Sequence, residues 1–349
     1  MRSPLLLFVP ACALLLAACE RSSTAPDAAA KHVAAKPEGW FLFGGPVWTP
    51  VSLPFAPAAI NDAGVIVGRQ NGEAVRWENG TLTLLPRILT IAGPYSAIAI
   101  TAQGLILGAA PGHALLWTSP SATPIDLSGS IPVAAVGVND SYTVVANGLG
   151  RPWKWTPATG LQPMTAAQDG SEVTGLNATG YASGVQRTDV GVLPVRWDPS
   201  GVRTVLPVIE AGGATAQAIN DRGDIVGNSI SCLPVYACLS TVLVWHFDGS
   251  LSEDFGAPAG TAVSLSNAGR IIGDSSWTFY NGALTNLPLS NGFSASSSVN
   301  AARSLVTGVN TCGSIVGVRL GIANAGILWK RGSMGIAPAC DVTTPIATL

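Results

Sequence analysis

The sequence predicts an all-β protein, a β-propeller with seven four-stranded blades, and three observations support this prediction. A phrase at residues 59–68, AINDAGVIVG, returns along the chain in seven recognisable copies. An aromatic residue follows each copy, and a short turn with a leucine-rich segment follows most of them. A period of about forty residues that holds several short strands is typical of propeller blades, with six or eight blades as alternatives to seven. The turn positions of the copies are residues 61, 101, 139, 177, 220, 266 and 310.

Each copy predicts four short strands. The first consists of small residues, as at 215–219, and runs into an Asn-Asp-x-Gly turn in which glycine takes a positive φ. The second is brief and β-branched, as at 224–227, and the third contains the aromatic residue. The fourth follows an Asn-Gly or Asp-Gly pair such as Asn79-Gly80, which is a strong hairpin signal. A helical period is sustained nowhere in the chain.

The aromatic residues are expected to pack between blades, with each indole N–H bonded to a carbonyl. Small first strands fit the crowded axis of a ring whose stacked blades bury each other's faces. Residues 40–43 and 47–54 resemble the tryptophan half of a copy without a turn half before it, so we expect this N-terminal segment to complete the last blade. The aromatic positions are Trp77, Trp117, Trp155, Trp197, Trp245, Tyr280 and Trp329.

The repeat resembles the HAF-type extracellular repeat of bacteria, which is marked by A-x-x-I-N-x-x-G-x-I-V-G followed by A-x-x-W. Residues 59–77 and 218–245 carry this pattern best, and the resemblance covers about residues 56–337. Thr101, Tyr142 and Ser266 depart from it at turn positions. The resemblance implies an extracellular repeat protein, and it implies no particular activity because that family has no agreed one.

The composition argues against a nucleic-acid partner. Charged residues are 11% of the 349 residues, the net charge is −2, and the chain contains no run of lysine and arginine. Nucleic-acid binding needs a basic surface to neutralise phosphates. The hydrophobic share of 48% fits sheets that are buried on both faces.

Residues 1–19 are expected to be a lipoprotein signal peptide. Arg2 is the positive start, and residues 5–16 are an apolar core too short to span a bilayer stably. The segment Leu16-Ala17-Ala18-Cys19 resembles the lipobox of bacterial lipoproteins, which implies that Cys19 becomes the lipidated N-terminus. An ordinary signal peptide cleaved near Ala18 is the alternative. Glu20 in the next position implies, by analogy, the outer membrane or the cell surface.

After the signal peptide, residues 20–37 are expected to form a flexible tether and residues 38–345 a single propeller domain. That domain holds four cysteines, and an even number in an exported chain suggests disulfides. A metal site is the less supported alternative, because no Cys-x-x-Cys and no nearby histidine accompanies them. The preferred pairs are Cys232–Cys238 and Cys312–Cys340.

No constellation typical of catalysis is evident in the sequence. His32 lies in the tether, while His113 and His246 lie near the third strands of two different copies, where we expect a structural or surface role. A catalytic triad needs a histidine between a nucleophile and a carboxylate, and the chain has no Gly-x-Ser-x-Gly elbow. We therefore predict no catalytic residue, no metal and no cofactor. The turn acids, one per turn and too few for a calcium cage, are interpreted as turn formers: Asp62, Asp140 and Asp221.

The predicted binding face carries the longest connections. Insertions extend the link between second and third strands at residues 186–191, 229–241 and 319–324. These links emerge on the same face as the connections from each fourth strand to the next blade, and variable loops on a rigid ring are common binding sites. Neutral loop drift is the alternative. The candidate residues are Tyr95, Asp169, Glu172, Arg187, Glu210, Tyr236, Asp254, Arg303 and Arg319.

These features predict a lipid-anchored, monomeric module of the cell envelope that binds a protein or a glycan without catalysis. The alternative is a glycan hydrolase or lyase with carboxylates at the channel mouth, which requires two acids at roughly 5 to 9 Å. Asp169, Glu172 and Glu210 around one pocket would favour that alternative. A purely structural envelope protein is a third possibility.

Overall fold

The computed structural model describes residues 47–164, 170–189, 191–209, 213–232, 238–253, 261–274, 276–288, 304–319 and 325–332. The chain divides into two units, Met1–Gly44 and Gly45–Leu349, and all described residues belong to the second. In these ranges every regular element is a strand, and there is no helix long and apolar enough to cross a membrane. The predicted signal peptide, Cys19 and the predicted tether lie outside the described residues.

The strands form seven sheets of four, and each sheet is one blade. From the innermost strand outward, blade 1 contains β2 (Ala56–Ile60), β3 (Ile66–Gln70), β4 (Glu73–Glu78) and β5 (Thr81–Leu84). Blade 2 contains β6 (Ser96–Ile100), β7 (Ile106–Ala110), β8 (His113–Trp117) and β9 (Ile125–Asp126). Blade 3 contains β10 (Ala134–Val138), β11 (Val144–Gly148), β12 (Arg151–Thr156) and β13 (Gly160–Pro163).

The remaining blades have the same order. Blade 4 contains β14 (Ser171–Leu176), β15 (Ala182–Thr188), β16 (Gly191–Trp197) and β17 (Arg203–Val205). Blade 5 contains β18 (Ala214–Ile219), β19 (Ile225–Cys232), β20 (Cys238–Trp245) and β21 (Leu251–Glu253). Blade 6 contains β22 (Ala262–Leu265), β23 (Ile271–Gly273), β24 (Trp277–Tyr280) and β25 (Ala283–Asn286). Blade 7 contains β26 (Ser304–Val309), β27 (Ile315–Arg319), β28 (Gly326–Gly332) and β1 (Val47–Leu53).

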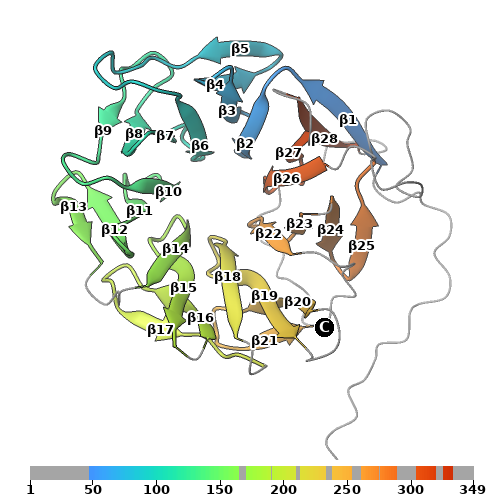
Figure 1. The fold of residues 1–349 in the computed structure, drawn as a ribbon. Helices are drawn as coiled ribbons and strands as arrows, with labels where there is room; N and C mark the ends of the chain where they lie inside the picture. The colour runs from blue at the N-terminus through green and yellow to red at the C-terminus, as the bar shows by residue number, and fades with distance from the viewer. Residues whose placement is uncertain are drawn as a thin grey trace, which may run out of the picture. The chain divides into compact units, whose positions relative to one another are not determined.

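The seven blades stand in a ring around a central axis, with the first strand of each blade innermost (Figure 1). The ring is closed by β1, which pairs antiparallel with β28 from Val47 opposite Gly332 to Leu53 opposite Gly326. The predicted all-β, seven-bladed propeller is therefore confirmed, and so is its closure by the N-terminal strand.

Every innermost strand contains one β-bulge at the same place, just before its turn. A bulge bends a strand and leaves one residue unpaired. At two of these unpaired positions a threonine hydroxyl donates to the first strand of the next blade: Thr174 to the Ala216 carbonyl at 2.9 Å and Thr307 to the Pro57 carbonyl at 3.0 Å. The bulges lie at residues 57/59, 97/99, 135/137, 173/175, 216/218, 262/264 and 306/308.

Tryptophan side chains pack between the blades, as predicted for Trp117, Trp197, Trp245 and Trp329, which are fully buried. The predicted Trp77, Trp155 and Tyr280 are only half-buried, and in blades 3 and 6 the more buried tryptophans are Trp153 and Trp277. The predicted bond from each indole N–H to a carbonyl is wrong for Trp197, whose Nε1 has no partner among the described residues.

The other three fully buried tryptophans donate their indole N–H to a proline carbonyl that follows the last strand of the preceding blade. These bonds run from Trp117 to Pro86, from Trp245 to Pro207 and from Trp329 to Pro288, at 2.7 to 2.8 Å. The tails that follow the last strands of blades 1, 4 and 6 thus end in an acceptor for the tryptophan of the next blade.

The glycine that ends the repeated phrase leaves room for the tryptophan of its own blade. A Cβ on Gly227 would lie 2.8 Å from the Trp245 ring and would collide with the Thr215 carbonyl. Gly184 stands in the same relation to Trp197. In blade 3 an alanine, Ala146, occupies this position, opposite the buried Trp153. The Gly and the Trp of the repeat are therefore one packing unit.

We predict that Gly227→Ala lowers the free energy of unfolding by about 2 kcal/mol, the usual cost of overpacking a filled core. Urea denaturation monitored by tryptophan fluorescence measures the change. Gly308→Ala is the matched control, because its added Cβ would find its nearest neighbours at 3.3 Å. Equal losses for both variants would contradict this account.

Candidate functional site

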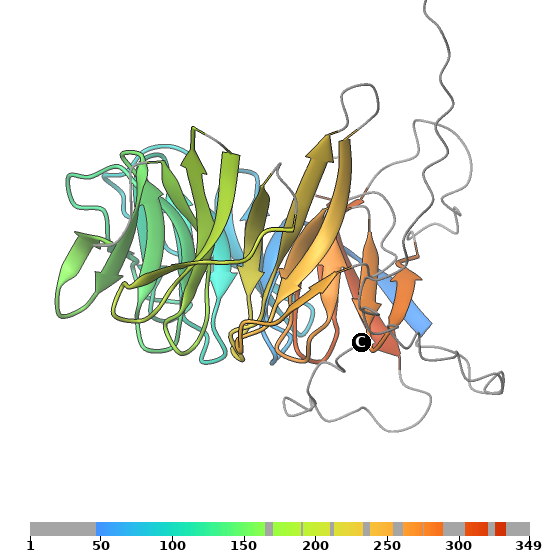
Figure 2. The same cartoon turned by 90° about the horizontal axis from the view of Figure 1, so that it is seen from below.

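The ring has two faces that differ in the connections they carry. In an antiparallel four-stranded blade, the first-to-second and third-to-fourth turns lie on one face, which we call the turn face. The second-to-third hairpins and the links to the next blade lie on the other, which we call the loop face. The side view in Figure 2 shows the strands running between these two faces.

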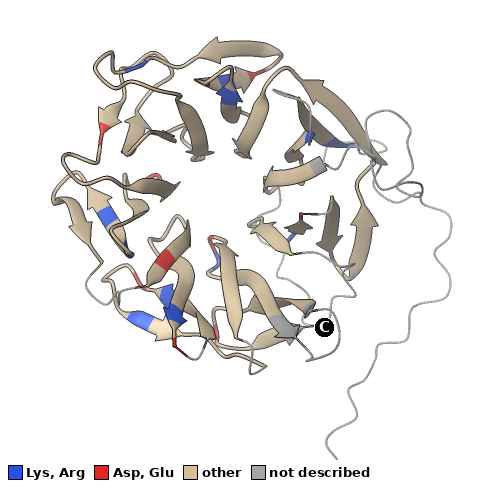
Figure 3. Cartoon of the chain, in the orientation of Figure 1, with Lys and Arg blue, Asp and Glu red and all other residues tan. Residues whose placement is uncertain are grey.

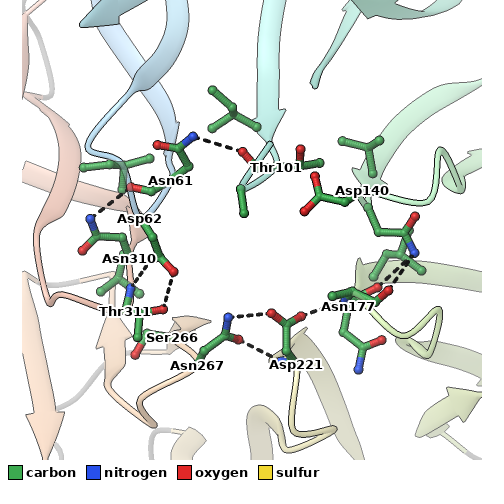
Figure 4. A pocket seen from close by; sticks show the side chains of 18 of the residues that line it. Asn61, Asp62, Thr101, Asp140, Asn177, Asp221, Ser266, Asn267, Asn310 and Thr311 are labelled. Atoms are coloured by element: carbon green, nitrogen blue, oxygen red, sulfur yellow. Dashed lines mark hydrogen bonds between the residues drawn. The ribbon is translucent and has the colours of Figure 1, made fainter. Parts of the chain in front are cut away.

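A pocket of about 190 Å³ opens on the axis at the turn face, and all seven first-to-second turns line it. Asn61 and Asp62 of blade 1 and the equivalent residues of the other blades point around its rim (Figure 4). Because each turn comes from the same point of the repeat, sevenfold repetition of one sequence phrase builds this polar ring.

The first residue of each turn accepts a hydrogen bond from the backbone N–H four residues later. An asparagine Oδ1 does this in five blades, and the hydroxyls of Thr101 and Ser266 do it in the other two. This bond closes the turn locally, as Asx and Ser/Thr turns do. The asparagine acceptors are Asn61, Asn139, Asn177, Asn220 and Asn310, at 2.8 to 3.0 Å.

The same five asparagines also join one blade to the next. Each Nδ2 donates to the carbonyl of the equivalent residue in the following blade, and we call these contacts amide bridges. Thr101 and Ser266 have no amide, so no bridge leads from blade 2 to blade 3 or from blade 6 to blade 7. The bridges are Asn61 to Thr101 (3.0 Å), Asn139 to Asn177 (3.3 Å), Asn177 to Asn220 (3.0 Å), Asn220 to Ser266 (3.3 Å) and Asn310 to Asn61 (3.1 Å).

The turn acids, Asp62, Asp140 and Asp221, form a second set of contacts between blades. Asp62 accepts from the N–H of Thr311 at 2.7 Å, Asp140 from the N–H of Gln103 at 3.2 Å and Asp221 from the N–H of Ala178 at 2.7 Å. These donors all belong to the preceding blade. The described residues contain no cluster of three His, Cys, Asp or Glu side chains that could hold a metal. The turn acids are thus turn residues, as expected, that also fasten neighbouring blades.

On the loop face, the structure brings two predicted binding residues together. Glu172 on β14 and Arg187 on β15 form an ion pair at 3.5 Å, and their side chains are 49% and 61% exposed. Charged side chains of both signs are spread thinly over the blades (Figure 3). Blade 1 has a comparable ion pair on this face, Glu73 with Arg87 at 2.7 Å, and its side chains are less exposed than those of Glu172 and Arg187.

Tyr95 is not a binding residue, because its side chain is fully buried. Its hydroxyl donates to the Ile88 carbonyl at 3.0 Å, and the Arg87 guanidinium stacks on its ring. Its position in a connection on the loop face did not reveal this inward orientation. Arg319 ends β27 on the loop face and is partly exposed. The other candidates lie outside the described residues: Asp169, Glu210, Tyr236, Asp254 and Arg303.

The predicted loop at 229–241 is largely a hairpin. Strands β19 and β20 run on to Cys232 and Cys238, and their register places these two cysteines opposite each other. Both strands are eight residues long. Cys312 is disulfide-bonded. Both disulfide pairings stay predictions, because the sulfur atoms of the other cysteines lie outside the described residues.

Blade 6 contains a buried cationic side chain, that of Arg270. Arg270 follows the turn, is 4% exposed and stacks on the Tyr280 ring at 4.2 Å. Burial, and secondarily the charge of Arg331, lower the pKa of Arg270 to about 10. The arginine therefore packs as part of the core and is not presented to a ligand.

Comparison with solved structures shows the fold and nothing finer. Virginiamycin B lyase from Staphylococcus aureus is similar, with TM-score 0.57, 11% identity, and coverage of 81% of this chain and 100% of that one. A streptogramin B lyase is similar with TM-score 0.52 and 11% identity, and the match covers 82% of this chain and 98% of that one. The extracellular domain of a hybrid two-component system from B. thetaiotaomicron is similar with TM-score 0.50 and 9% identity, and the match covers 83% of this chain and 40% of that one. No protein-family model and no curated protein matches the chain.

We predict that Ser266→Asn stabilises the protein by about 1 kcal/mol, because the new amide can bridge to the Asn310 carbonyl. The reverse change, Asn177→Ser, keeps the turn acceptor but loses its bridge, and it should destabilise by about the same amount. Chemical denaturation of both variants measures these shifts. Shifts of the same sign in the two variants would contradict the role given to the bridges.

Proposed function

We propose that this protein is an exported, lipid-anchored propeller that binds a protein or a glycan through its loop face. The observation that carries the proposal is that the two faces of the ring differ in how regular their side chains and connections are. The turn face uses its recurring Asn and Asp side chains to fasten blades together, whereas the loop face differs from blade to blade. A rigid ring with variable connections is a suitable frame for recognition, because little conformational entropy is lost on binding.

The loop face offers the chemistry that such recognition needs. The half-exposed pair of Glu172 and Arg187 supplies a hydrogen-bond acceptor and a planar donor. The long hairpin of β19 and β20 stands beside it in the next blade. The glycan-hydrolase alternative is less favoured, because the acids on the axial pocket, Asp62, Asp140 and Asp221, already accept backbone N–H groups.

The lipid anchor rests on the sequence around Cys19. We predict that Cys19→Ala abolishes incorporation of labelled palmitate and moves the protein from the membrane fraction to the soluble fraction. Cys12→Ala, in the apolar core of the signal peptide, is the matched control and should leave both properties unchanged. Membrane association that survives Cys19→Ala would rule out this anchor.

For the binding face, we predict that Glu172→Lys weakens binding about tenfold, since it turns an attractive pair into a repulsive one. The measurement is binding of the purified full-length chain to a glycan array and to biotinylated envelope proteins. Asp248→Lys makes the same charge change on the turn face and should leave binding intact. If Asp248→Lys loses binding and Glu172→Lys does not, the binding surface lies on the turn face.

The hairpin provides an independent variant. Ser229 opposite Thr241 in blade 5 corresponds to Gln70 opposite Glu73 in blade 1, where Asn71-Gly72 makes the turn. Replacing residues 230–240 by Asn-Gly therefore gives blade 5 the blade 1 hairpin and preserves the register. Binding that is unchanged by both this trimming and Glu172→Lys would overturn the proposal.

A further inference from the structure

Three side chains on blade 5 make a continuous Ser–His–Asp chain near the turn face. His246, directly after β20, lies with Nε2 2.9 Å from the Ser252 Oγ and Nδ1 3.4 Å from the Asp224 Oδ1. Ser252 lies on β21, the outermost strand of the blade. With the imidazole proton on Nδ1, His246 donates to Asp224 and accepts the hydroxyl proton of Ser252. This is the connectivity of a catalytic triad.

Asp224 is held as a fixed, buried acceptor. It is 7% exposed, and its Oδ2 accepts from Arg222 Nε at 3.1 Å and from Asn220 Nδ2 at 3.2 Å. These donors leave Oδ1 for the histidine, so the carboxylate fixes both the tautomer and the orientation of the ring. The His246 side chain retains 13% exposure, which gives solvent and small molecules access to it.

The arrangement is a feature of blade 5 and not of the repeat. Asp224 stands where the other blades have residues of no common type, so turn formation does not demand a carboxylate there. Blade 2 has a His113–Asp126 pair at 2.9 Å, but no serine contacts that histidine among the described residues. The equivalents of Asp224 are Val65, Leu105, Thr143, Tyr181, Arg270 and Ser314.

We propose that Ser252, His246 and Asp224 form a hydrolytic site for short-chain carboxylic esters. The Ser252 oxygen bonds to the ester carbonyl carbon while its proton passes to His246 Nε2, and the bond to the alcohol breaks as the alcohol takes that proton. Water then attacks the acyl-serine and gives its proton to Nε2. The carboxylic acid leaves, and the serine oxygen regains a proton from the imidazolium.

The edge position of β21 supports this chemistry. Ser252 pairs with Val244, and in an antiparallel pair alternate residues turn their N–H groups inward. Leu251 and Glu253 therefore direct their N–H groups away from β20, toward the outer edge of the blade, and these are the donors that the proposed site assigns to the oxyanion. An acetyl ester needs no acyl-binding cavity beyond the reacting serine, so short-chain esters are the substrate class that these three side chains can serve by themselves.

The test uses the full-length chain with a tagged fluorophosphonate and with p-nitrophenyl acetate. We expect the probe to attach to Ser252 by peptide mass spectrometry, and we expect Ser252→Ala to abolish both labelling and hydrolysis. His246→Ala should lower both rates by about 100-fold or more, the usual value of a general base. Wild-type protein that reacts no faster than Ser252→Ala would overturn the proposal.

Two controls separate chemistry from folding. Ser250→Ala removes a serine two residues away whose hydroxyl bonds to Asp248, and it should leave labelling and hydrolysis unchanged. His113→Ala removes the histidine of the incomplete pair in blade 2 and should also have no effect. Thermal unfolding identifies any variant that is misfolded. Ser252→Val, a β-branched residue without a hydroxyl that resembles Ile125 at this position of blade 2, then replaces Ser252→Ala. An equal loss in Ser250→Ala and Ser252→Ala would assign the reaction elsewhere.

Discussion

The fold depends on the requirement that seven separate sheets meet around one axis without leaving buried backbone groups unpaired. Asparagine at the start of a turn meets this requirement twice. Its Oδ1 accepts the N–H that closes its own turn, and its Nδ2 donates to a carbonyl of the next blade. Serine and threonine can do only the first. This is a physical reason for an asparagine in five of seven turns.

Apolar packing and polar bridging act at different distances from the axis. Near the axis the space is narrow, so the first strands carry small residues, bend at a bulge and are tied by amides and hydroxyls. Farther out the blades diverge, and the tryptophans fill the wider gap, as Trp245 does against Gly227 and the Pro207 carbonyl. The repeated phrase therefore encodes both regions, with its asparagine for the inner one and its final glycine for the outer one.

The blade count, the strand order, the closure by residues 47–53 and the buried tryptophans of blades 2, 4, 5 and 7 could be predicted, because each depends on local pattern and repetition. In blades 3 and 6 a second aromatic residue lies close by in the sequence, and the pattern did not show that Trp153 and Trp277 are the more buried ones. The bulges could not, since a one-residue change of register leaves no mark in composition. Tyr95 was wrongly assigned to a surface because position in a connection does not fix side-chain direction. The contact of Asp224, His246 and Ser252 was missed because Asp224 lies directly before β19, His246 directly after β20 and Ser252 on β21, and only the pairing of these three strands brings them together.

The two missing amide bridges have a mechanical consequence. They divide the circle into an arc of blades 3, 4, 5 and 6 and an arc of blades 7, 1 and 2. The chain's own break, between β1 and β28, falls inside the second arc, where a full strand pairing spans it. The joint beside Thr101 keeps the bond from the Gln103 N–H to Asp140, so we expect relative motion of the two arcs to be largest at the joint beside Ser266.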